Sequence, residues 1–291
     1  MVSASIIIPT LNAGGTIGPL IDQLKKQTIQ LEKILIIDSS SDDETVAIAQ
    51  KHGASTIVID RNNFDHGGTR NQAFLATISE FVLFMTQDAV PVDQNYVENI
   101  LEVFKNRNVA LASGRQIAKK DAQRYEQLVR EFNYGPNSFV RTKNDIPQFG
   151  IKTFFASDVC SAYRRSAYLS CGGFSYPCNT NEDMLMAAKF ILSGFSVAYV
   201  ANAKVFHSHN LSFFQQFRRN REISLFLVQH ATELAGASEY GEGRRLAIHI
   251  FKTLIKERRF TEICGFFVDC IARILGNFAG KFLASVRLTR N

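Results

Sequence analysis

The sequence predicts an α/β fold: a mostly parallel sheet flanked by helices, with a C-terminal helical extension. Three observations support this prediction. Short apolar runs alternate with segments of helical periodicity along the N-terminal two thirds of the 291-residue chain. Strand, helix and strand follow one another within the first forty residues, an arrangement that joins parallel strands. From residue 213 onward the pattern is helical.

The first three elements show why the sheet is expected to be parallel. Residues 4–8 form an apolar run that a proline and a glycine-bearing loop close. Residues 17–24 carry apolar side chains at helical spacing, and a second apolar run, 33–37, ends at Asp38. A helix between two buried strands is a crossover connection, so the two strands should run in the same direction.

The alternation then continues to the helical region. The further expected strands are 55–59, 81–85, 109–113 and 195–200, and the expected helices are 44–52, 72–79, 94–106, the start of 124–141, one opening at 181, 213–236, 244–259 and 260–278. We expect a domain of residues 1–220 and a basic, amphipathic helical extension of residues 221–291.

Composition and charge exclude several classes of protein. Hydrophobic residues make up 46% and charged residues 21% of the chain, as in ordinary folded proteins. The net charge of +6 is concentrated in residues 244–291, which contain ten Lys and Arg and three Asp and Glu. This distribution argues against a nucleic-acid-binding core and favours a cationic surface that meets anionic lipid or another polyanion.

The cysteines and the hydropathy pattern indicate the cellular compartment of the protein. The five cysteines are odd in number and form no CxxC pair, which predicts a reduced, cytosolic setting without a zinc site or disulfide framework. We see no signal peptide and no charge-free apolar stretch of 18 residues, so no helix need span a membrane. The amphipathic segment 260–278 could lie in a membrane interface, or pack on the core or another subunit.

Asp88 is the first candidate for chemistry. The apolar run 81–85 ends abruptly in a polar turn and delivers Asp88 to its C-terminal tip. Ligands of open α/β sheets bind at such tips. The alternative is a simple turn that uses Asp and Pro for their backbone preferences.

His207 and His209 are candidate metal ligands. If their segment is extended, alternation places both side chains on one face, the spacing that two ligands of one ion can use. A pair of ordinary surface histidines is the alternative. The metal hypothesis therefore requires a partner such as Asp88.

Two further segments offer charge at the start of a helix. Gly67 and Gly68 precede a helix with Arg70 one step inside it, an arrangement that suits an anion because free N–H groups and the helix dipole favour negative charge. Glu182 and Asp183 open another helix. The alternatives are a plain glycine turn and the usual preference for acidic residues in a first turn.

The order of these features is more specific than any one of them. An Ile-Ile-Ile-Pro-Thr-Leu-Asn run, Asp38, the strand-tip Asp88 and the pair Glu182-Asp183 resemble the family 2 glycosyltransferases with the Rossmann-like GT-A fold. The segments Phe-Asp-His-Gly-Gly-Thr-Arg-Asn, at 64–71, and Thr-Gln-Asp-Ala resemble the bacterial rhamnosyltransferase branch. The resemblance covers roughly residues 4–220.

This resemblance implies roles for individual residues. Asp183 would be the general base, and Glu182 beside it would help raise its pKa toward the working range. Asp38 would accept a hydrogen bond from a pyrimidine. The implied donor-binding residues are Thr10, Asn12, Asp38, Gly68, Arg70, Gln87 and Arg218, the last within a Gln-Gln-Phe-Arg-Arg run.

The resemblance also implies a divalent cation, Mg²⁺ or Mn²⁺, that stabilises the diphosphate leaving group. The family commonly carries Asp-x-Asp, whereas this chain has Gln87-Asp88-Ala89 and thus one carboxylate. Phosphate, water and either His207 or His209 would complete the coordination, and Mn²⁺ tolerates imidazole better than Mg²⁺ does.

The implied activity is an inverting transfer of a sugar, with dTDP-L-rhamnose as the expected donor, onto a lipid-linked cell-surface polysaccharide. We expect cytoplasmic localisation, with peripheral contact of the C-terminal helices on the inner face of a bacterial membrane, and no nucleic-acid partner. The sequence leaves the oligomeric state undecided, with a homo-oligomer as one alternative. The alternatives are another nucleotide sugar or an inactive binding module, because the metal motif is reduced. A nucleotidyltransferase is disfavoured, since no glycine-rich, lysine-containing phosphate loop follows the first strand.

Overall fold

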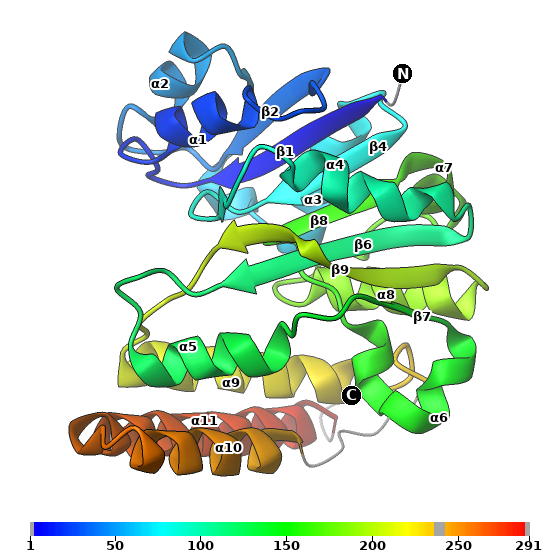
Figure 1. Cartoon of the computed structure of the whole chain (residues 1–291). Coiled ribbons are helices and arrows are strands. Elements are labelled where there is room, and N and C mark those ends of the chain that lie inside the picture. Colours follow the sequence, from blue (N-terminus) through cyan, green and yellow to red (C-terminus); the bar gives the residue numbers. More distant parts are fainter. Residues whose placement is uncertain (1–2, 236–241, 289–291) are drawn as a thin grey trace. The chain divides into compact units, whose positions relative to one another are not determined.

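The computed structural model describes residues 3–235 and 242–288, which form two compact units (Figure 1). The first unit comprises residues 1–116, 135–146 and 152–207, and the second comprises 117–134, 147–151 and 208–291. The domain boundary expected after residue 220 falls within helix α9 (Phe213–Gln229) of the second unit. The helix end expected at residue 236 lies outside the described residues.

The first unit is built on one mixed sheet with the strand order β3-β2-β1-β4-β8-β6-β9-β5, and β7 also pairs with β9. The strands are β1 (Ala4–Thr10), β2 (Lys33–Asp38), β3 (Ser55–Val58), β4 (Phe81–Met85), β5 (Val90–Pro91), β6 (Val109–Ile117), β7 (Phe139–Arg141), β8 (Cys160–Arg164) and β9 (Ser196–Phe206).

The parallel prediction is confirmed for the N-terminal strands. β1 pairs in parallel with β2 and with β4, and β2 pairs in parallel with β3. The rest of the sheet differs, because β8 is antiparallel to β4 and β6, and β9 is antiparallel to β5 and β7. The sequence did not identify β8, a short strand with serine and cysteine among its residues, which inserts between β4 and β6.

Helices cover both faces of this sheet. They are α1 (Ile17–Leu24), α2 (Thr45–Lys51), α3 (His66–Leu75), α4 (Tyr96–Glu102), α7 (Arg165–Ser170) and α8 (Glu182–Leu192); α6 (Ile146–Phe149) and the 3₁₀ turns Arg61–Asn63, Val103–Lys105, Lys143–Asp145 and Gly150–Phe154 lie in connections. Ile8 and Leu83 join the core under α1, while Phe84 joins an aromatic cluster with Phe74 of α3. Burial on both faces explains the continuous apolar runs.

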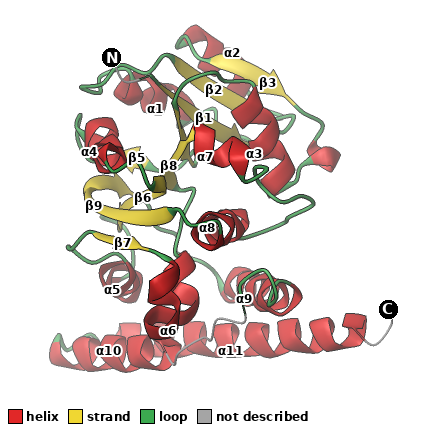
Figure 2. Ribbon diagram, turned by 90° about the vertical axis from the view of Figure 1, so that its right-hand side faces the viewer, coloured by secondary structure: helices red, strands yellow, loops and turns green. Residues whose placement is uncertain are grey.

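The second unit is a group of helices: α5 (Arg124–Asn133), α9, α10 (Glu242–Lys256) and α11 (Phe260–Leu288). Figure 2 shows α11 as one long, unbroken helix. It packs closely on α9 because Gly276 and Gly280, four residues apart, face the backbone oxygens of Phe217 and Arg221. Ser224 Oγ of α9 also donates to the carbonyl oxygen of Asn277 at 3.0 Å.

The opposite side of α11 is apolar and exposed. Its exposed side chains recur at helical spacing: Phe267, Ile271, Ile274, Phe278 and Phe282. By length and composition alone, the segment Phe260–Val286 could cross a membrane. The sequence-based expectation that no helix need do so rested on the charges of this segment, among them Asp269 and Arg273, which pair with each other at 2.6 Å.

The substitution Gly276→Ala should destabilise the protein, since a Cβ there would overlap the Phe217 carbonyl oxygen in the α9 backbone. Overpacking of this kind costs about 1–3 kcal/mol, more than the gain in helix propensity, which is about 1 kcal/mol. Urea denaturation followed by circular dichroism measures the change. Gly265→Ala on the same helix is the control, because its Cβ would make only an ordinary contact at 3.7 Å. Equal stability of the two variants would contradict the prediction.

Candidate active site

The parallel strands β1 and β2 bring Thr10, Asn12 and Asp38 to one edge of the sheet. Thr10 and Asp38 are register partners, and Thr10 Oγ1 donates to Asp38 Oδ1 at 2.7 Å. The fully buried Asp38 also accepts from the hydroxyl and the backbone N–H of Ser41. Asn12 Oδ1 accepts from the N–H of Asp42 at 2.8 Å. The carboxylate and both neighbouring loops are therefore fixed in place.

Gln87 joins β4 to the loop after β1. Its Oε1 accepts from the backbone N–H of Leu11 at 2.8 Å, and its Nε2 donates to the Leu11 carbonyl oxygen at 3.1 Å. A carboxylate could accept but could not donate, so it would leave the second contact unmade. The two contacts with Leu11 fix the backbone next to Asp88.

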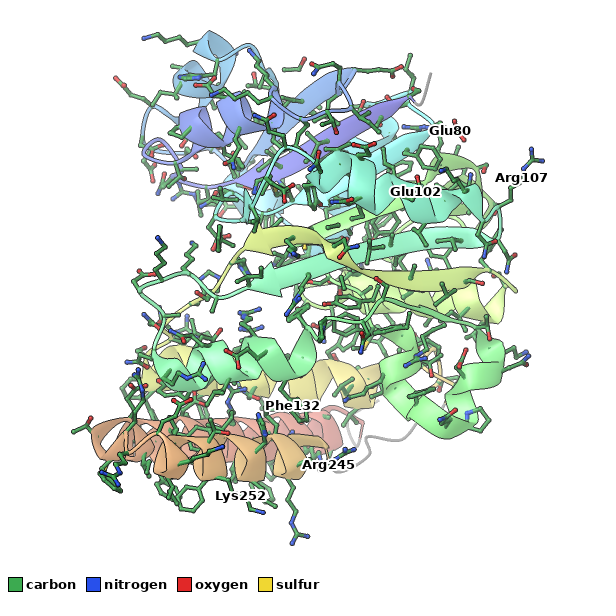
Figure 3. The ribbon with its side chains drawn as sticks, in the orientation of Figure 1. Glu80, Glu102, Arg107, Phe132, Arg245 and Lys252 are labelled. Carbon is green, nitrogen blue, oxygen red and sulfur yellow. The ribbon has the colours of Figure 1, made fainter. Side chains whose placement is uncertain are left out.

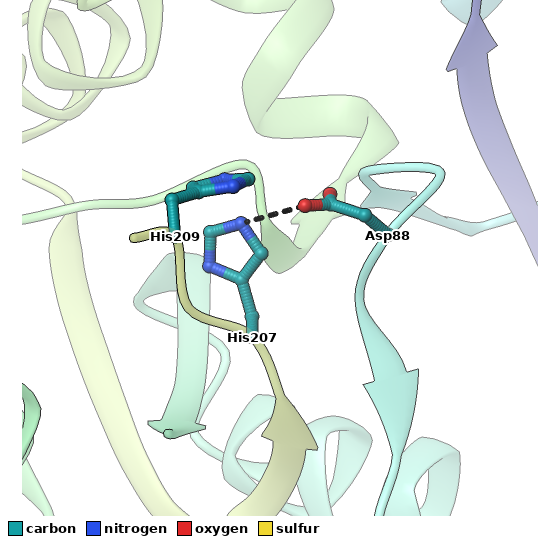
Figure 4. A group of neighbouring side chains, drawn as sticks. All are labelled: Asp88, His207 and His209. Atoms are coloured by element: carbon teal, nitrogen blue, oxygen red, sulfur yellow. Dashed lines mark ion pairs between the residues drawn. The ribbon is translucent and has the colours of Figure 1, made fainter. Parts of the chain in front are cut away.

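Strand pairing brings Asp88 and His207 together (Figure 4). Val90 of β5 is the register partner of Phe206 of β9, so continuing the antiparallel register places His207 opposite Ala89, the residue next to Asp88. His207 Nε2 is 3.5 Å from Asp88 Oδ2. His209 follows two residues later in the chain, and one ligand atom from each of the three residues lies within 4.8 Å of the others.

A neighbouring amide orients His207. Gln116 Oε1 lies 2.9 Å from His207 Nδ1, and Gln116 Nε2 donates to Ser157 Oγ at 2.9 Å. If Gln116 accepts from Nδ1–H, the tautomer this network assigns presents the Nε2 lone pair to Asp88. In metal sites, a histidine commonly binds the ion through one ring nitrogen while the other, here Nδ1, is hydrogen-bonded to a neighbour. One imidazole nitrogen together with carboxylate oxygens is a set of ligands that fits Mn²⁺.

A second group of charges surrounds the buried Arg70, which is 5% exposed. Its Nη1 lies 3.1 Å from Glu182 Oε1, and its Nε lies 3.5 Å from Asp158 Oδ2. The backbone N–H of Asp158 donates to Asp183 Oδ2 at 3.1 Å, and the N–H of Met184 donates to Asp183 Oδ1 at 2.7 Å. Two carboxylates thus pair with one guanidinium, and a third, Asp183, lies next to them without an ion pair to Arg70.

Burial and this surplus of negative charge raise the pKa values of Asp183 and Asp158. The pKa of Asp183 is raised well above its ordinary value, first because protein atoms surround the group and then because Glu182 and Asp158 are negative. Burial, opposed by Arg70 and assisted by Glu182, raises the pKa of Asp158 to about 6. Asp183 is half-buried and has a raised proton affinity, so it is suited to accept a proton near neutral pH.

The helix start at Gly67 and Gly68 differs from the expectation. Helix α3 begins at His66, six residues before the expected start, because Asp65 caps it: Asp65 Oδ1 accepts from the Gly68 N–H at 2.5 Å. The Gly67 N–H donates to the Cys178 carbonyl oxygen at 3.2 Å. The two N–H groups predicted to be free for an anion are therefore already paired.

Arg218, a predicted donor-binding residue, is exposed on α9 of the second unit.

Two residues that contact the candidate site, Asp158 and Gln116, did not stand out in the sequence, because the partners of each are distant in the chain. A lone acid in the apolar stretch before Cys160 was the one available signal for Asp158, since such an acid must find partners when buried.

Comparison with known proteins identifies relatives over nearly the whole chain. Residues 5–171 match the profile described as glycosyl transferase family 2. The chain is 40% identical to the O-antigen chain rhamnosyltransferase WbaN of Salmonella anatum, with 99% of this chain and 92% of that protein aligned. It is 38% identical to RfbN of Salmonella typhimurium, also an O-antigen chain rhamnosyltransferase, with 98% and 91% aligned.

Solved structures show the same fold at low sequence identity. A Pyrobaculum calidifontis mannosyltransferase in complex with GDP-Man and Mn²⁺ has a TM-score of 0.59 at 16% identity, over 99% of this chain and 78% of that one. TarS of S. aureus in complex with UDP-GlcNAc has a TM-score of 0.61 at 16% identity, over 87% and 71%. The expected α/β fold with C-terminal helices is thus confirmed.

The substitution Gln116→Leu should weaken Mn²⁺ binding about tenfold or more, because the His207 ring loses the acceptor that orients it. Isothermal titration of the protein with MnCl₂ measures the affinity. Gln50→Leu is the matched control, since Gln50 contacts only Thr56 among the hydrogen bonds described for it. Unchanged affinity in Gln116→Leu, or an equal loss in both variants, would argue against a metal site at Asp88 and His207.

Proposed function

Since the chain belongs to glycosyl transferase family 2, we propose that it transfers a sugar from a nucleotide-sugar donor onto a growing cell-surface polysaccharide. The two relatives that align over more than nine tenths of their length are O-antigen chain rhamnosyltransferases. We therefore propose L-rhamnose as the sugar and dTDP-L-rhamnose as the donor. The observation that carries the proposal is the carboxylate group around Asp183, with its raised pKa.

In the proposed reaction, Asp183 accepts the proton of the acceptor hydroxyl. The hydroxyl oxygen forms a bond to the anomeric carbon from the side opposite the leaving group, which inverts the configuration there. The bond to the diphosphate oxygen breaks, and its electron pair leaves with the nucleoside diphosphate. Glu182 and Asp158 raise the proton affinity of Asp183, so proton acceptance is favourable near neutral pH.

The remaining site residues bind and position the reactants in this proposal. Asn12 would line the nucleotide pocket, and the buried Asp38, bonded to Thr10 and Ser41, would hold the loop after β2 beside it. Asp88 and His207, with His209, would hold a divalent cation that supplies positive charge to the departing diphosphate. The cation is Mn²⁺ in preference to Mg²⁺, because imidazole is among the ligands.

The buried Arg70 takes a different role from the one its position suggested. Its guanidinium lies between Glu182 and Asp158, so its charge is already matched by protein carboxylates. We propose that Arg70 positions these carboxylates around the base. Gly68, whose N–H is held by Asp65, supports the helix start that carries Arg70.

We further propose peripheral binding of the second unit to the inner face of the membrane, where a lipid-linked acceptor would be presented. The exposed apolar stripe on α11 supports this proposal, and exposed basic residues of α10, including Arg245 and Lys252, would meet anionic lipid (Figure 3). The other side of α11 carries the paired Asp269 and Arg273 and packs on α9, which favours a helix lying in the interface.

The substitution Asp183→Asn should reduce rhamnosyl transfer by a factor of about 10² to 10⁴, because the amide cannot accept the proton. Binding of the nucleotide sugar should stay unchanged. Transfer from dTDP-L-rhamnose to a lipid-linked acceptor is followed by chromatography, and donor binding by calorimetry. Asp22→Asn, at an exposed carboxylate paired with His52, is the control. Full transfer in Asp183→Asn would rule out this base.

The same assignment fixes the sign of the pH dependence. Because the pKa of Asp183 is raised, the wild-type rate should fall as the pH drops through a value above the ordinary aspartate range. A rate constant that stays level down to the ordinary aspartate pKa of about 4 would contradict the assignment.

The substitution Phe278→Glu should weaken binding to phosphatidylglycerol vesicles about tenfold or more, since it replaces an apolar side chain that is 68% exposed on the α11 stripe with a charge. Co-sedimentation with the vesicles measures the effect. Phe214→Glu is the control, at a phenylalanine that is 78% exposed on α9. An equal loss in both variants would show that the α11 stripe is not the contact surface.

A further inference from the structure

The second unit contains a partly open cavity of about 160 Å³ among three of its helices. Residues from α5, α9, α11 and the segment before α9 line it. The polar side chains that matter for the argument are Glu126, Arg130, Arg219, Asn220, Asp269 and Arg273. The volume corresponds to about five water molecules, which is enough for a phosphate group.

Charge within this cavity is unbalanced. Arg130 Nε pairs with Glu126 Oε1 at 2.9 Å, and Arg273 Nε pairs with Asp269 Oδ2 at 2.6 Å. Arg130, Glu126 and Asp269 are buried. The third arginine, Arg219, lines the cavity with its side chain exposed to solvent, and it has no hydrogen bond or ion pair among the residues that the structure describes. One guanidinium of the cavity is therefore in excess over its carboxylates.

The surroundings of Arg219 disfavour its charge. Its pKa is lowered, first by the protein atoms packed along part of the side chain and then by the positive charges of Arg130 and Arg273, while the exposed part of the side chain stays in contact with water. An anion bound in the cavity would offset this repulsion. Guanidinium groups bind phosphate oxygens through two parallel hydrogen bonds, and three of them around one cavity suit a phosphate better than a carboxylate of single charge.

Helix α11 indicates where such a phosphate would come from. Asp269, Arg273, Gly276 and Gly280 form one stripe, which faces the cavity and α9. Ile271, Ile274 and Phe278 lie on the exposed apolar stripe of the same helix. A helix that is polar toward the cavity and apolar toward the outside suits a ligand whose phosphate enters the protein while its hydrocarbon stays in a membrane.

We propose that this cavity is a binding site for the phosphate or diphosphate of the lipid-linked acceptor, with Arg219 as its principal contact and Arg130 and Arg273 as supporting charges. The identity of the ligand rests on the proposed function, because a polysaccharide transferase at the membrane needs a carrier-linked acceptor. The site would hold the lipid end of the acceptor. Asp183, Asp88 and His207 belong to the first unit, whereas His209, the third candidate metal ligand, belongs to the second unit and is among the residues that line the cavity.

Binding of the full chain to neutral phosphatidylcholine vesicles that contain a prenyl diphosphate tests the proposal. Arg219→Gln should weaken this binding about tenfold or more, since it removes a charge-assisted contact. Arg219→Lys should restore part of the affinity. Arg221→Gln is the matched control, because Arg221 lies on the same helix but pairs with Glu222 and does not line the cavity.

Two further probes distinguish the sources of the anion. Vesicles with phosphatidylglycerol at equal surface charge should show no difference between Arg219→Gln and Arg221→Gln. Inorganic pyrophosphate should bind the wild type more weakly than the prenyl diphosphate vesicles do. An equal effect of Arg219→Gln on both kinds of vesicle, or tighter binding of free pyrophosphate, would overturn the assignment to a lipid-linked diphosphate. No loss of binding in Arg219→Gln would overturn the site itself.

Kinetics separate this proposal from the proposed function. Arg219→Gln should raise the KM for the lipid-linked acceptor about tenfold, while the Kd for the nucleotide sugar and the transfer rate to a soluble acceptor without phosphate stay unchanged. An unchanged KM in an active enzyme would refute the cavity assignment alone. Absence of any transferase activity in the wild type, together with Arg219-dependent diphosphate binding, would refute the proposed function and leave the anion site standing.

Discussion

The charge balance around the buried Arg70 is the constraint on which the first unit depends. A guanidinium removed from water must be paired, and the loss of one partner in such a pair costs about 3–5 kcal/mol. Arg70 draws together the start of α3, the segment before β8 and the start of α8 through Asp158 and Glu182. Because Arg70 pairs with Asp158 and Glu182 but not with Asp183, negative charge remains in excess at Asp183. The contacts that hold these segments together therefore also raise the proton affinity of the candidate base.

Strand pairing within the same sheet also positions the candidate metal ligands Asp88 and His207. The short β5 begins two residues after Asp88 and pairs with the end of β9, which is followed directly by His207. Antiparallel pairing places residues from distant parts of the chain opposite each other without a long side chain to span a gap. Gln116 and Ser157 then fix the imidazole ring. The candidate metal ligands are thus positioned by backbone hydrogen bonds and a short relay of side chains.

The second unit separates polar from apolar chemistry along one helix. Glycines at two positions allow α11 to lie against the α9 backbone, and the same stripe carries Asp269 and Arg273 to the cavity. On the opposite side of the helix, the side chains are apolar and exposed. Because these stripes share one rigid helix, binding at a membrane surface and binding of an anion in the cavity would be mechanically linked.

By itself, the sequence determined the α/β class, the four parallel N-terminal strands and the order of Asp38, Asp88 and Asp183, because apolar periodicity and strand ends are local features. The antiparallel half of the sheet, the insertion of β8 and the contacts of Asp158 and Gln116 were decided only by the tertiary structure. Local periodicity does not specify which strand lies beside another. Likewise, the N–H groups of Gly67 and Gly68 look free in the sequence but are paired in the fold, since their acceptors come from a capping side chain and a distant loop. Hydrogen-bond partners and pKa values depend on neighbours in space, and the chain order of residues does not contain them.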